Sequence, residues 1–175
     1  MKNFYLFILS LFALYSSSVQ AGECQTNVTN MRLNPLAIVF NGAEGGVDFG
    51  ISKTVSMGVD LSYIHDLSAL TGIKGTAKGA GLRLNHLPSG FYENSFISTV
   101  GLHVSRLDLK GDVNAKTDAI SGDVSLGYRW YWPDSGFNTS LTAGLAQVHV
   151  KNRDLVNETA KGVTPTAELS FGYQL

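Results

Sequence analysis

A histidine and a serine two residues apart, His103 and Ser105, have the residue types that nucleophilic chemistry needs. Residues two apart in an extended strand place their side chains on the same face, so the imidazole could act as a base for the serine hydroxyl. Asp123, in the next apolar segment, is a carboxylate that could orient the imidazole. These three are the candidate catalytic residues; the alternative is that they are ordinary polar side chains of two strands.

Metal and cofactor chemistry has weaker support. His65 and His149 each have an aspartate nearby, Asp66 and Asp154, but they lie on separate segments without a fixed local spacing. We therefore expect exposed histidines and no metal site. The chain has no phosphate loop, no Cys-x-x-Cys pair and no dinucleotide fingerprint, so we expect no cofactor.

The N-terminus predicts a secretory signal peptide over residues 1–21. Lys2 precedes an apolar run that is shorter than the roughly 20 residues of a membrane-spanning helix, and Val19-Gln20-Ala21 is a small-x-small cleavage pattern. Cys24 would then be the third mature residue, whereas a lipoprotein needs cysteine at the first, so we expect a silent cysteine. We predict a short periplasmic segment over 22–33.

The composition is unusual for a soluble domain. Only 15% of the 175 residues are charged and 19 are glycine, whereas soluble proteins have about 25% charged residues. The formal net charge of -1 argues against nucleic acid as a partner. With so few charged residues, the chain is not expected to rely on a charged surface for contact with its surroundings.

Apolar and polar residues alternate strictly along the mature chain, which indicates strands with one apolar face. Two architectures fit: a soluble sandwich or barrel, and a transmembrane barrel with its apolar face in lipid. The polar face is mainly Gly, Ser, Thr and Asn rather than Lys and Glu, which favours the crowded interior of a narrow membrane barrel. Aromatic residues near the strand ends predict an interfacial girdle, made by Tyr128, Trp130, Trp132 and Phe137.

Short and long connections alternate along the chain. Short ones are expected at 52–54, 88–94 and 133–136, and longer polar ones at 66–74, 110–117 and 152–162. Bacterial outer-membrane barrels place short turns in the periplasm and longer loops outside. The strands predicted between them are 55–65, 75–86, 95–109, 118–132, 137–151 and 163–175.

The region 34–52 decides the strand count. Its apolar residues fall first on even positions and then, after a glycine-rich stretch, on odd ones: Leu36, Ile38 and Phe40, then Val47, Phe49 and Ile51. This change of phase favours a tight hairpin, although a bulge in one strand would also produce it. A hairpin gives an all-β, eight-stranded, antiparallel up-and-down transmembrane β-barrel over 34–175.

Inward-facing charges should pair with one another, because unpaired charges in a narrow interior are costly. We expect an interior ion network that fills the lumen, made from residues on the polar phase: Asp48, Asp60, Arg83, His103, Asp123, Arg129 and Glu168. The sequence alone does not assign the pairs.

The last strand resembles the C-terminal insertion signal of Gram-negative outer-membrane proteins, with Leu169, Phe171, Tyr173 and Leu175 on its apolar phase. The chain also resembles small OmpA/OmpX-type barrels and related barrel families, most clearly in Asn34-Pro35-Leu36, in Ser56-Met57-Gly58-Val59 and in 126–132. The resemblance implies an outer-membrane location, contact with lipids including lipopolysaccharide, and the barrel-insertion machinery as a partner. It implies no particular activity. From the short, nearly neutral loops we expect a structural or surface-interaction role without catalysis, with a surface ligand as one partner that the loops could hold, and we expect a monomer.

The alternative function is a lipid A-modifying enzyme. The His-x-Ser spacing of His103 and Ser105 resembles that of the outer-membrane deacylases, with Asp123 as the third residue. Arg106 departs from that motif, and the phase of the strand points both side chains into the lumen rather than toward lipid.

Overall fold

The computed structural model describes residues 28–39, 41–66, 74–110, 115–152 and 159–175. The predicted signal peptide, Cys24 and Asp154 lie outside them. Eight strands and one short helix follow one another along the chain: β1 (Thr29–Leu33), α2 (Pro35–Val39), β2 (Gly42–Gly50), β3 (Val55–Ile64), β4 (Lys74–His86), β5 (Ser95–Lys110), β6 (Ala115–Trp132), β7 (Phe137–Asn152) and β8 (Thr159–Gln174).

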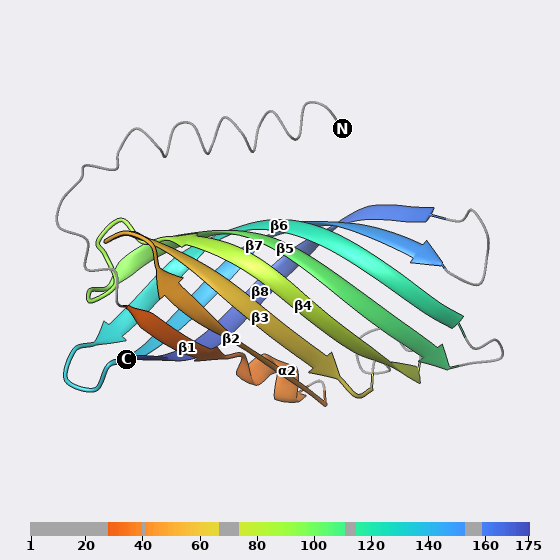
Figure 1. Cartoon of the computed structure of the whole chain (residues 1–175), viewed down its shortest axis with the longest axis horizontal. Coiled ribbons are helices and arrows are strands. Elements are labelled where there is room, and N and C mark those ends of the chain that lie inside the picture. The colour runs from red at the N-terminus through yellow and green to blue at the C-terminus, as the bar shows by residue number, and fades with distance from the viewer. Residues whose placement is uncertain (1–27, 40, 67–73, 111–114, 153–158) are drawn as a thin grey trace, which may run out of the picture.

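Each strand pairs antiparallel with the next, and β8 pairs with β1, so the sheet closes into a barrel (Figure 1). The joint between β1 and β8 is short, because only residues 30–33 pair with residues 171–174. The predicted eight-stranded antiparallel up-and-down barrel is confirmed. Among the described residues, no helix is long and apolar enough to cross a membrane.

The two ends of the barrel differ in their connections. β1 begins and β8 finishes at one end, which we call the terminal end, together with the short connections 51–54, 87–94 and 133–136. Glycines with positive φ angles, Gly90 and Gly136, shape two of these turns. The opposite end, the loop end, holds α2 and the connections 65–73, 111–114 and 153–158. The strands extend further here than predicted, so Lys110 and residues 115–117 belong to β5 and β6.

The outer face of the barrel is apolar and the inner face is polar. Leu126, Leu102 and Phe96 are each more than 60% exposed, whereas Asp60, Arg83 and Asn85 are buried. This arrangement is the reverse of a water-soluble domain and requires an apolar surrounding. Outward apolar residues run from Phe96 to Val104 in β5, about the length of a tilted strand that crosses a bilayer.

The polarity of the wall inverts at the loop end. On β5, Arg106, Asp108 and Lys110 face outward, whereas Leu107 and Leu109 face the lumen. Strands that continue past the apolar band therefore exchange an apolar outer surface for a charged one. The change between Val104 and Arg106 marks the edge of the apolar band on this strand.

The first hairpin differs from the one predicted. The first strand is Thr29–Leu33, within the segment assigned to the periplasm, so the barrel begins before residue 34. Asn34 caps α2 by accepting a hydrogen bond from the backbone N–H of Leu36 (3.0 Å), and Pro35 occupies the first helical position. Asn41, with a φ of 54°, follows the helix in the left-handed conformation that often ends one. Residues 42–46, expected as a turn, form the first half of β2.

The aromatic residues form a belt around the terminal end. Trp132 and Phe137 have ring centroids 5.3 Å apart, and Phe137 lies 5.9 Å from Phe171. Tyr128 contacts both Trp130 and Phe96. All of these rings are on the outward phase of their strands.

Candidate functional site in the barrel interior

Two arginines and three carboxylates form one buried ion network in the middle of the lumen. The arginine from β1, Arg32, reaches Asp48 (2.5 Å) and Asp60 (2.7 Å) and lies 3.4 Å from Glu168. The arginine from β4, Arg83, reaches Asp60 (2.6 Å) and Glu168 (3.1 Å). We call these five residues the central network; it connects β1, β2, β3, β4 and β8 across the barrel.

Amide side chains complete the hydrogen bonding of the central network. Asn30 and Asn85 each donate to Asp48, over 3.3 and 3.2 Å. Thr99 in turn donates to the amide oxygen of Asn85 (2.9 Å). Buried carboxylates are stable only when their oxygens are both paired and hydrogen-bonded, and this network meets both conditions.

Arg129 lies apart from the central network. Its guanidinium donates to the backbone carbonyl of Phe91 and to the side-chain oxygen of Gln174 (2.9 Å). Among the described residues, no carboxylate lies within ion-pair distance of Arg129, although the sequence analysis grouped it with the interior ion pairs. Arg129 comes from β6, whereas the carboxylates of the central network come from β2, β3 and β8, none of which is next to β6 in the barrel.

Glycine stands directly opposite the inward-facing polar residues. Gly46 pairs with Asp60 and Gly58 with Asp48 across β2 and β3. A β-carbon at Gly46 would lie 2.2 Å from an Asp60 oxygen, and one at Gly58 would lie 2.2 Å from an Asp48 oxygen. The glycines therefore provide the space in which these carboxylates lie flat against the neighbouring strand.

The lumen is filled unevenly along its axis. At the terminal end, Val28, Leu87, Phe91 and Ile97 form a buried apolar cluster. The cavity left between this cluster and the central network is about 20 Å³, room for about one water molecule. On the loop side of the network, a cavity of about 210 Å³ opens, with His103 and Asp123 among the side chains that line it.

Two of the three candidate catalytic residues contact each other. His103 Nε2 lies 2.9 Å from an Asp123 oxygen, and both side chains face the cavity on the loop side. Gly81 and Gly101 leave room for this pair, since β-carbons there would lie 2.3 Å from His103 Nδ1 and an Asp123 oxygen. Within the described chain, no hydrogen bond joins Ser105 to His103, so the structure pairs a histidine with a carboxylate but does not add the serine.

Among the described residues, no group of three or more His, Cys, Asp or Glu side chains could hold a metal ion. His65 contacts Tyr63 instead, with 3.3 Å between its Nδ1 and the phenol oxygen. His149 pairs in register with Ile120 and Lys161, on a different part of the wall.

The sequence analysis missed Arg32, the residue that bonds to all three carboxylates of the central network. The segment that holds it, 30–33, does alternate: Asn30 and Arg32 face inward while Met31 and Leu33 face outward. This four-residue pattern was the available signal. It was assigned to the periplasmic segment because the apolar residues 36–40 competed for the first strand.

The chain therefore folds as a closed eight-stranded antiparallel barrel with an apolar outer face and a charged, hydrogen-bonded interior. The N-terminal β-barrel domain of Pseudomonas aeruginosa OprF is similar in structure, with a TM-score of 0.54 over 86% of this chain and 98% of that domain. The two share 12% sequence identity, so the similarity shows the fold. No protein-family model matches the chain. No curated protein matches it in sequence.

Proposed function

We propose that this chain is a monomeric outer-membrane protein of the Gram-negative envelope, with a closed lumen and a structural or surface-interaction role without catalysis. The observation that carries the proposal is the central network. Its side chains come from five strands and fill the middle of the barrel, where a diffusion pathway would have to run. The similar fold of the OprF N-terminal β-barrel domain supports the barrel architecture on which the proposal rests.

The charge and packing of the lumen support closure. Arg32, Asp48 and Asp60 are each less than a tenth exposed, and breaking such a set leaves uncompensated buried charge. An eight-stranded interior is wide enough only for side chains. The apolar cluster at the terminal end is a second layer that water and ions would have to cross.

The position of the His103–Asp123 pair supports a role without catalysis. A lipid-cleaving site needs its nucleophile and base at the lipid-facing surface, whereas His103 and Asp123 line the lumen. Within the described residues, no hydrogen bond joins the Ser105 hydroxyl to the His103 imidazole, so the imidazole is not placed to activate the hydroxyl as a nucleophile. Deacylation of lipid A is therefore the less supported candidate.

The proposed orientation places the terminal end in the periplasm and the loop end outside, as the short turns require. Leu169, Phe171, Tyr173 and Leu175 lie on the outward phase of β8 and would be read by the barrel-insertion machinery. The aromatic belt would then lie at the periplasmic membrane interface, with outer-membrane lipids around the apolar band.

Four measurements test the proposal. The protein should be found in the outer-membrane fraction and migrate differently in gels before and after heating, and it should give no stable single-channel steps in planar bilayers. Reproducible conductance steps would show that the lumen is open. Lipid A mass spectra from cells with and without the protein should be identical; a changed acyl pattern would replace this proposal with the enzymatic one.

A further inference from the structure

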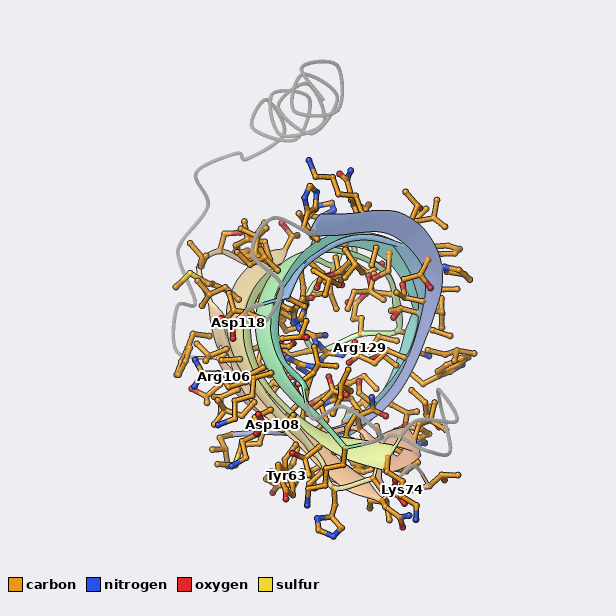
Figure 2. All side chains as sticks on the ribbon, turned by 90° about the vertical axis from the view of Figure 1, so that its right-hand side faces the viewer. Tyr63, Lys74, Arg106, Asp108, Asp118 and Arg129 are labelled. Carbon is orange, nitrogen blue, oxygen red and sulfur yellow. The ribbon has the colours of Figure 1, made fainter. Side chains whose placement is uncertain are left out.

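The outer face of β4, β5 and β6 has a concentration of charge at the loop end. The outward residues there include more bases than acids: Lys74, Lys78, Arg106, Lys110 and Lys116 against Asp108 and Asp118. Figure 2, which looks along the barrel from this end, shows Lys74, Arg106, Asp108 and Asp118 outside the ring of strands, whereas Arg129 lies within it. This part of the outer surface is therefore net positive.

Two of the cations are held next to each other by the strand register. Lys78 on β4 pairs with Arg106 on β5, and Arg106 pairs with Asp118 on β6. The Nε of Arg106 donates to Asp118 (3.2 Å), and within the described residues no hydrogen bond engages its two terminal nitrogens. The Lys78 ammonium lies 5.6 Å from the centre of the Tyr63 ring, which keeps it on the outer face.

A groove runs from these cations into the apolar band. Its volume is about 470 Å³, and Lys78, Arg106 and Asp118 line its charged end. Toward the middle of the barrel it is lined by Ala80, Val104 and Ile120. The small side chain of Ala80 makes room for the groove. The next outward residue on β4, Leu82, is much larger and does not line it.

We propose that this groove binds a phosphorylated, acylated lipid of the lipopolysaccharide class from the outer leaflet. The phosphate lies between Lys78 and the free nitrogens of Arg106, and an acyl chain lies along Ala80, Val104 and Ile120. Asp118 is a positioning residue that orients the guanidinium. The inference rests on the proposed outer-membrane location, which brings such lipids to the loop end.

The surroundings favour a lipid over the other possible occupants. A soluble anion would use the cations but leave the apolar part of the groove unexplained. A second copy of the chain, related by a two-fold axis through this surface, would place the positive residues against themselves and be repelled. Only a molecule with a negative head and a hydrocarbon tail matches both parts of the groove.

Native mass spectrometry of the processed protein in detergent tests the inference, with diphosphoryl lipid A and its dephosphorylated form as probes. The variant K78Q/R106Q should retain diphosphoryl lipid A at least about tenfold more weakly, since it loses two charge-assisted contacts. The control K53Q/K161Q makes the same charge change elsewhere, at the 51–54 turn and on β8, and should bind like the wild type. Wild-type protein should discriminate against the dephosphorylated lipid.

A second variant tests the apolar part of the groove. A80W fills the hollow and should weaken retention of diphosphoryl lipid A, whereas L82W, one outward position further along β4, should not. The inference would be overturned if wild type and K78Q/R106Q retained diphosphoryl lipid A equally. It would also be overturned if the wild type retained the diphosphoryl and dephosphorylated lipids equally. The inference would also be overturned if the lipid-free wild type is a dimer and K78Q/R106Q is a monomer, since the surface would then be an interface between two copies of the chain.

Heat-dependent gel migration distinguishes a wrong lipid site from a wrong proposed function. If all variants keep the migration shift and none discriminates between the probes, the barrel assignment holds and the lipid site is wrong. If the wild type shows no migration shift and is absent from the outer-membrane fraction, the proposed function itself fails.

Discussion

Glycine determines how closely the interior charges can approach the barrel wall. Gly46 lies opposite Asp60, and a β-carbon there would also lie 2.6 Å from the backbone oxygen of Val59, which cannot move aside as a side chain could. The high glycine content therefore has a specific structural use. It places carboxylates where two arginines can reach them.

We predict that Gly46→Ala destabilises the folded barrel by about 1–3 kcal/mol, the usual cost of overpacking. The measurement is the free energy of unfolding in urea, followed by gel migration. Gly162→Ala is the matched control, since nothing lies within 4 Å of a β-carbon at that position. A loss of stability at Gly162 as large as that at Gly46 would contradict this explanation.

Removal of one cation from the central network should cost more than removal of an exposed one. Arg32→Gln leaves Asp48 and Asp60 buried without their shared partner, which we expect to lower the free energy of unfolding by about 3–5 kcal/mol. Arg106→Gln breaks an exposed pair and should cost less than about 1 kcal/mol. Equal effects in urea titrations would mean that the central network does not stabilise the fold.

At the scale of elements, α2 forms most of the connection between β1 and β2 at the loop end. Its N-terminus depends on Asn34, which caps the helix and also donates to Glu44 (2.8 Å). The helix packs close to β2, because a β-carbon at Gly42 would lie 3.2 Å from the Ala37 carbonyl oxygen. Asn34 therefore connects the start of α2 to Glu44, which lines the cavity on the loop side.

Asn34→Ala should destabilise α2 locally by about 1 kcal/mol, the typical value of a lost N-cap. Hydrogen exchange at the amides of Leu36 and Ala37 should become faster by the corresponding factor of about five. Asn34→Ser keeps a capping oxygen and should retain most of the protection. Unchanged exchange in Asn34→Ala would show that packing alone holds the helix.

Six strands could be predicted from the sequence because each has a long alternating pattern with a distinct polar face. β1 could not, since it is only five residues long and lies before Leu36 and Ile38, whose spacing also resembles a strand. The Asn34-Pro35 pair was the overlooked signal for a helix. The ion pairs themselves depend on register and on Arg32, so the residues of the network were partly predictable and its pairings were not.

At the scale of the whole molecule, the described part of the lumen has a larger cavity on the loop side of the central network than on the terminal side. The cavity of about 210 Å³ lies on the loop side of the central network, and Ser121 is among its lining residues. Ser56 lies on the other side, 2% exposed and next to the cavity of about 20 Å³. The two serines therefore line cavities on opposite sides of the central network.

Cysteine labelling should reveal this asymmetry. In a Cys24→Ser background, Ser121→Cys should react with a small charged thiol reagent added to the folded protein, whereas Ser56→Cys should react only after unfolding. Mass spectrometry of the labelled protein gives the extent of reaction. Rapid labelling of both cysteines would show that the central network does not separate the two parts of the lumen.

The short joint between β1 and β8 has a consequence for how the barrel forms. Seven of the eight strand pairings join consecutive strands and can assemble as local hairpins, whereas Asn30 must meet Gln174 across almost the whole mature chain. Closure of so long a loop carries the largest entropic cost and is compensated by only four residue pairs. We therefore expect this joint to form last, with the edges of β1 and β8 unpaired until it does.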